Sequence, residues 1–183
     1  MKQGFVKVAA ASCAVAVADV RENTRVILET IHKMEDEGAK VMVLPELALT
    51  GYTCSDLFWQ SQMIDAAKEG LKEIADGTKG TDALIFVGLP WEQGGKLFNV
   101  AAVLCHGELL GVVPKKYLPN YNEFYELRHF TPGKEAVTTT EFFGKEVPFG
   151  MNLLFQCAEM PRLKVAAAVS YTHLRAHETP EHL

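Results

Sequence analysis

The first half of the chain alternates between short apolar runs and stretches whose apolar residues recur three or four positions apart. Three of the apolar runs are typical of buried strands, and they cover residues 6–13, 41–44 and 84–89. Between them, helical spacing brings Ile27, Ile31 and Met34 onto one face, and residues 61–75 repeat the pattern. Strand and helix in alternation predict an α/β domain, in which helices pack against the outside of a sheet.

The second half of the chain changes to strands that follow one another directly. The expected strands cover residues 97–105, 109–113, 153–156 and 163–168. The first two are separated by His106-Gly107-Glu108, which is typical of a hairpin turn. In the first helix, Asp19 or Asn23 is the expected N-cap and Gly38 the expected stop. The pattern predicts a mixed sheet, and it leaves open whether there is one sheet or two.

Composition excludes several classes of protein. The 183 residues carry a net charge of −5, which argues against binding to nucleic acid or to anionic membranes as the main role. No apolar run approaches the roughly 18 residues of a membrane-spanning helix, and the first residues lack the pattern of a signal peptide. The four cysteines lie far apart, without a C-x-x-C pair, so we expect buried thiols and no metal site. These features predict a cytoplasmic protein.

Glu46 is the first candidate for catalysis. It follows the apolar run 41–44 and Pro45, and it precedes Thr50-Gly51-Tyr52. A carboxylate at the end of a buried strand lies close to the core, where it can serve as a general base. The alternative is a surface glutamate that caps a loop.

Lys115 is the second candidate, and it opens the segment 115–126. That segment holds two lysines, four aromatic residues and two glutamates around Pro119, and it follows the expected strand 109–113. So many charges would each need a buried partner, so we expect a loop at a strand end and not part of the core. A lysine there can stabilise an oxyanion. Lys115 and Lys116 cannot both face one pocket from extended backbone, and the alternative is that both are solvated.

The rest of this segment supplies further candidates. Glu123 lies eight residues after Lys115, far enough for a loop to fold back to the same pocket. Arg128 is expected to pair with Glu123 or Glu126, or to bind a substrate carboxylate. Cys54 lies near Glu46 in sequence, but a loop cysteine without a neighbouring histidine is weak evidence for a nucleophile.

Two of these motifs together resemble the nitrilase, or carbon-nitrogen hydrolase, superfamily. Val43-Leu44-Pro45-Glu46 is similar to its glutamate motif, and the segment from Pro114 to Pro119 is similar to its lysine motif. The resemblance implies a four-layer α-β-β-α sandwich, here incomplete at the C-terminus. It also implies that Glu46 is the base, that Lys115 is the catalytic lysine and that Glu123 is a second, substrate-orienting glutamate.

Within the superfamily, two stretches resemble the amino-terminal glutaminase domain of bacterial glutamine-dependent NAD⁺ synthetases. They are residues 52–58 and the segment 118–126 with Arg128 and Phe130. This resemblance implies that glutamine is the small-molecule substrate, that Tyr121 helps to place its amide, and that the intact enzyme is a homo-oligomer. Glutamine hydrolysis itself would need no cofactor, whereas the synthetase domain, which would lie outside this chain, would use ATP and Mg²⁺.

The resemblance breaks at residue 169, where the composition also changes. The family's cysteine nucleophile is expected here, but Ser170 stands at the aligned position. Residues 169–183 hold three of the six histidines and resemble a translated cloning sequence, so we expect residues 1–168 to be a partial glutaminase domain with a non-native tail. The other interpretation of the tail is a native disordered end. The chain as given is expected to be inactive.

Two other functions stay open at this point. One is a fragment of a stand-alone nitrilase-family amidase or carbamoylase. The other is a non-catalytic domain that acts through oligomer contacts.

Overall fold

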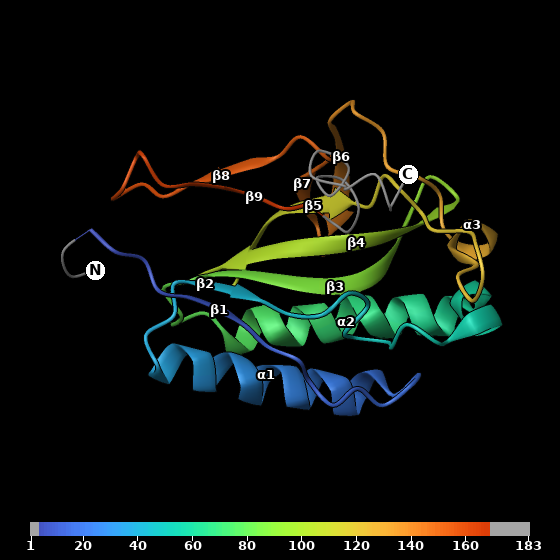
Figure 1. The fold of residues 1–183 in the computed structure, drawn as a ribbon, viewed down its shortest axis with the longest axis horizontal. Coiled ribbons are helices and arrows are strands. Elements are labelled where there is room, and N and C mark those ends of the chain that lie inside the picture. The colour runs from blue at the N-terminus through green and yellow to red at the C-terminus, as the bar shows by residue number, and fades with distance from the viewer. Residues whose placement is uncertain (1–3, 169–183) are drawn as a thin grey trace.

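The computed structural model describes residues 4–168, arranged in layers that Figure 1 shows from the side. Helices α1 (Val20–Asp36) and α2 (Ser61–Gly77) form one outer layer beneath a seven-stranded sheet. A two-stranded hairpin of β8 (Leu154–Gln156) and β9 (Lys164–Ala166) lies over the opposite face of that sheet. Ser170 and the expected tail lie outside the described residues, so the domain boundary after residue 168 stays a prediction.

The seven-stranded sheet is mixed, as its sequence pattern predicts. The strand order is β1-β2-β3-β4-β5-β7-β6, and three pairs are parallel (β1–β2, β2–β3 and β5–β7). The other pairs are antiparallel. The strands are β1 (Val8–Ala10), β2 (Val41–Val43), β3 (Leu84–Gln93), β4 (Lys96–Cys105), β5 (Glu108–Pro114), β6 (Thr138–Phe142) and β7 (Lys145–Phe149).

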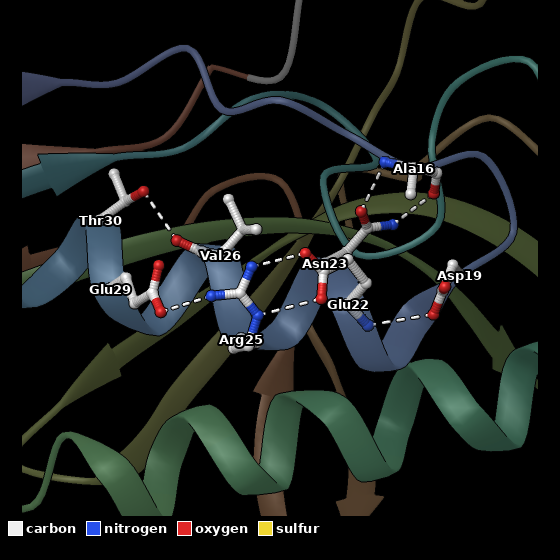
Figure 2. Close-up of polar contacts among 8 residues, drawn as sticks. All are labelled: Ala16, Asp19, Glu22, Asn23, Arg25, Val26, Glu29 and Thr30. Carbon is white, nitrogen blue, oxygen red and sulfur yellow. Dashed lines mark hydrogen bonds and ion pairs between the residues drawn. The ribbon is translucent and has the colours of Figure 1, made fainter.

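Helix α1 begins at a side-chain cap and is tied to a distant loop. Asp19, one of the two expected caps, accepts a hydrogen bond from the backbone N–H of Glu22 (Figure 2). Asn23 is instead buried inside the helix, where its side chain bonds both backbone groups of Ala16 and the carbonyl of Leu49. These bonds hold the chain before α1 against the loop that carries Glu46.

The two faces of the sheet bury different sets of side chains. On the helix side, alternate residues of β3 are fully buried with the apolar faces of α1 and α2, and they are Ile85, Val87, Leu89 and Trp91. On the other side a smaller cluster of Val41, Phe86, Val103 and Val113 packs under the hairpin, where Phe155 meets the ring of Phe86 edge-on. Both faces of the central strands are therefore apolar, which explains their nearly continuous apolar runs.

The mixed α/β fold that the sequence predicts is confirmed, but the pattern misses several elements. The missed elements are β6, β7 and two short helical segments, η1 (Ser55–Trp59) and α3 (Glu126–His129). Strands β6 and β7 bury only two side chains each and carry charges on their exposed face, so their apolar signal is weak. Their turn, Phe143-Gly144, has positive φ at both positions but lacks the usual Asn-Gly sequence. No helix in the part of the chain described is long and apolar enough to cross a membrane.

Candidate active site

Glu46 lies where the chain leaves β2 and turns across β3. Leu44 still bonds the carbonyl of Phe86, and the turn then runs through Leu47, which has a φ of 50°. Gly88 of β3 allows this path, because a Cβ there would lie 2.5 Å from the nitrogen of Leu47 and 2.9 Å from the carbonyl carbon of Glu46. The backbone on both sides of Glu46 is thus packed directly on the sheet.

Lys115 follows the last residue of β5 and is also held by its backbone. Its N–H donates to the carbonyl of Asn99 on β4 at 2.8 Å, and its own carbonyl accepts from Gly133 at 2.8 Å. The side chain is only 1% exposed. An ammonium buried to this extent needs anionic partners in contact with it.

Those partners are two glutamates from different parts of the chain. The Nζ atom of Lys115 lies 2.7 Å from Oε1 of Glu46 and 2.8 Å from Oε1 of Glu126. Two neutral donors complete the cluster, since the Tyr52 hydroxyl donates to Glu126 at 2.8 Å and the Asn99 amide donates to Glu46 at 2.5 Å. The group therefore carries two carboxylates for one ammonium, and charge-assisted hydrogen bonds hold it in one geometry.

The glutamate that contacts Lys115 is Glu126, whereas Glu123 lines the pocket beside it, so the substrate-orienting role of Glu123 stays a prediction. Glu126 is 4% exposed, while Glu123 is exposed on the turn before α3. The expectation that the segment 115–126 lies outside the core is wrong at its two ends, since Lys115 and Glu126 are both buried. Lys115 and Glu126 can both be buried because each is the other's charged partner.

The other residues of the segment lie nearer the surface. Tyr121 is half exposed and packs edge-on against Phe124. Arg128 pairs with neither Glu123 nor Glu126, but with Asp56 of η1, through two bonds of 3.0 Å. A pocket of about 450 Å³ lies here, and its walls include Tyr52, Glu123 and Glu126.

A second pocket, of about 310 Å³, lies beside Glu46 between the sheet and the hairpin. The Glu46 side chain is 30% exposed, so it is accessible while Lys115 behind it is not. The pocket is lined on its hairpin side by residues 165–168. Ala168, the last described residue, therefore faces the same pocket as Glu46, whereas Ser170 lies beyond the described residues.

Cys54 does not have the environment of a nucleophile. Its thiol is buried and donates to the carbonyls of Thr50 and Gly51. Burial raises the pKa of this thiol, which disfavours the reactive thiolate. Within residues 4–168 no group of three or more histidine, cysteine or acidic side chains is arranged to hold a metal ion.

Sequence comparison matches residues 7–174 to the family model for carbon-nitrogen hydrolases. Curated relatives include the glutamine-dependent NAD(+) synthetase of Mycobacterium tuberculosis, which is 36% identical over 160 residues, or 87% of this chain and 24% of that protein. The enzyme of the same name from Aquifex aeolicus is 35% identical over 135 residues, or 74% of this chain and 23% of that protein. The chain thus spans about a quarter of the length of these relatives.

Solved structures give the same picture of the fold. A glutamine-dependent NAD(+) synthetase from Cytophaga hutchinsonii superposes with a TM-score of 0.79 at 29% identity, over 84% of this chain and 26% of that one. An amidase from Nesterenkonia sp. superposes with a TM-score of 0.62 at 23% identity, over 81% of this chain and 56% of that one. The amidase shows the fold alone.

Proposed function

The chain belongs to the carbon-nitrogen hydrolase family, and we propose that it is the glutamine-hydrolysing part of a glutamine-dependent NAD⁺ synthetase. The observation that carries this proposal is the buried Lys115 between Glu46 and Glu126, beside a pocket that reaches Ala168. The names of the curated relatives support glutamine as the substrate. In the whole enzyme the released ammonia would serve NAD⁺ synthesis in a second domain, where ATP and Mg²⁺ would act.

The chemistry that suits this arrangement is acyl transfer through a cysteine thiol. Glu46 takes the thiol proton, and the thiolate attacks the carboxamide carbon of glutamine. The Lys115 ammonium, buried beside Glu46, stabilises electrostatically the charge that develops on the amide oxygen. The C–N bond then breaks, and ammonia leaves with the proton held by Glu46. Water, deprotonated by Glu46, hydrolyses the thioester to glutamate and frees the thiol.

The nucleophile in this scheme belongs just after Ala168, because that residue lines the pocket beside Glu46. Ser170 stands there in this chain. A serine hydroxyl is scarcely ionised near neutral pH and lacks a histidine relay, so Glu46 is a poor match for it. We therefore propose that residues 169–183 are not native and that the chain as given does not hydrolyse glutamine.

Ammonia release from a panel of substrates tests the proposal. The 183-residue chain is compared with the protein expressed from its source gene, read past codon 168. We expect that the gene-encoded form releases ammonia from glutamine, and that the 183-residue chain does not. Turnover of simple nitriles or short amides without turnover of glutamine would refute the synthetase assignment and favour a stand-alone amidase. Hydrolysis of glutamine by the 183-residue chain would refute the proposal about its tail.

A further inference from the structure

Asn99 is a buried polar residue inside an apolar strand, and it touches both principal members of the site. Its side chain is 1% exposed, and its Nδ2 donates to Oε1 of Glu46 at 2.5 Å. Its backbone carbonyl accepts from the N–H of Lys115 at 2.8 Å. One residue of β4 thus links the base candidate and the lysine candidate, which are 69 positions apart in sequence.

The register of the sheet explains how Asn99 reaches both residues. On one side it pairs with Pro90 of β3, and on the other its neighbour Val100 pairs with Pro114 of β5. Lys115 directly follows β5, and its N–H therefore reaches the backbone carbonyl of Asn99. Asn99 thus lies between the strand that carries Lys115 and the strand on which the Glu46 turn is packed.

The side-chain amide of Asn99 is better explained by its contact with the site than by a contribution to folding stability. Its Oδ1 is buried and has no hydrogen-bond partner among the described residues, an arrangement that is unfavourable for folding. The amide cannot turn over to relieve this, because its oxygen would then face the Glu46 carboxylate. The geometry is thus explained by the need for a neutral donor at Glu46.

We propose that Asn99 is a positioning residue that fixes the carboxylate of Glu46 against Lys115. This inference rests on the proposed function of the site. Asn99 and Lys115 both donate to the same oxygen of Glu46, so together they set the orientation of the carboxylate. Because the amide is neutral, it orients the carboxylate without adding a second positive charge that would weaken a base.

A double-mutant cycle on the 183-residue chain tests the contact without any need for activity. Asn99→Asp places a carboxylate against that of Glu46, and Glu46→Gln removes the negative charge that accepts from both Asn99 and Lys115. Each single variant is expected to raise the urea-unfolding equilibrium constant about tenfold or more. In the double variant the new glutamine amide at position 46 can donate to the new carboxylate at position 99, and that carboxylate restores a negative charge close to Lys115. The unfolding equilibrium constant of the double variant should therefore be at least about tenfold smaller than the product of the two single effects predicts.

Glu146→Gln is the matched control, because Glu146 is exposed on β7. When Glu146→Gln is combined with Asn99→Asp, the changes that the two substitutions cause in the unfolding equilibrium constant should simply multiply. Multiplication in the Glu46→Gln pair as well would overturn the proposal. If Asn99→Asp does not fold, Asn99→Ser replaces it. The factor by which Asn99→Ser raises the unfolding equilibrium constant should then be at least about fivefold smaller in a Glu46→Ala background than in the parent.

The second readout separates positioning from simple structural support. In the gene-encoded form that releases ammonia, Asn99→Ser should lower kcat per folded molecule about tenfold or more and change KM less than twofold. An unchanged kcat per folded molecule would overturn the positioning role. A gene-encoded form that does not hydrolyse glutamine would refute the proposed function, while the unfolding cycle would still decide whether Asn99 fixes Glu46.

Discussion

Gly88 is the position at which the smallest substitution should disturb the candidate site. A Cβ at this position would point at the backbone of the Glu46 turn, at the carbonyl oxygen of Pro45 and 2.5 Å from the nitrogen of Leu47. These are backbone atoms, so no flexible side chain can move aside. The turn itself must shift if Gly88→Ala is to fold.

The size of the shift follows from these contacts. Moving the Leu47 nitrogen from 2.5 Å to an ordinary contact of about 3.4 Å displaces the turn by about 1 Å. Overpacking of this kind destabilises a core by about 1–3 kcal/mol, which lowers the folded-to-unfolded ratio roughly 5- to 150-fold. A displacement of about 1 Å in a catalytic group can reduce turnover roughly 10²-fold. We expect both the loss of stability and the loss of turnover, because Glu46 is part of this turn.

Gly80→Ala is the matched control, because a Cβ at Gly80 would meet nothing within 4 Å. Urea unfolding of the two variants gives the difference in stability, and ammonia release by the gene-encoded form gives the difference in turnover. If Gly88→Ala unfolds at the same urea concentration as Gly80→Ala and keeps its turnover, then close packing on β3 does not position Glu46.

Two further predictions concern the buried charges. Lys115→Met should destabilise the 183-residue chain by about 3–5 kcal/mol, because it leaves two carboxylates without their cation. Lys116→Met removes only a surface ion pair and should leave the urea midpoint close to that of the parent; equal urea midpoints for the two variants would contradict this. Glu126→Gln should destabilise by about 1–3 kcal/mol, and Glu123→Gln by no more than about 0.5 kcal/mol, in the same unfolding measurement. The reverse order would contradict the assignment of Glu126 as the buried partner of Lys115.

The sequence predicts the parts of the site that directly follow strong apolar strands. Glu46 and Lys115 each come next to a buried run, and strand ends that share one edge of a sheet bring such residues together. Glu126 is different, because ten residues of irregular chain separate it from Lys115. Its position depends on tertiary contacts, including the hydroxyl of Tyr52, and no local pattern distinguishes it from Glu123.

The sequence pattern does not indicate Asn99 either, but for a different reason. It lies inside a strand whose other residues are mostly apolar, where a single polar residue gives no periodic signal. A buried asparagine is costly without partners, so it is a useful marker once a strand has been identified. Its partner comes from a turn 53 positions away, and only the packing of that turn on Gly88 shows which one it is.

The most direct test of the central claim is the rate of ammonia release from glutamine by the gene-encoded form carrying Glu46→Gln or Lys115→Ala. Loss of a positioned base or of an oxyanion-stabilising cation should lower the rate roughly 10²-fold or more in each variant. Lys116→Ala, at the neighbouring lysine whose partner is the surface residue Glu135, should leave the rate near that of the parent. Near-parental turnover in either Glu46→Gln or Lys115→Ala would contradict the assignment of this cluster as the glutamine-hydrolysing site.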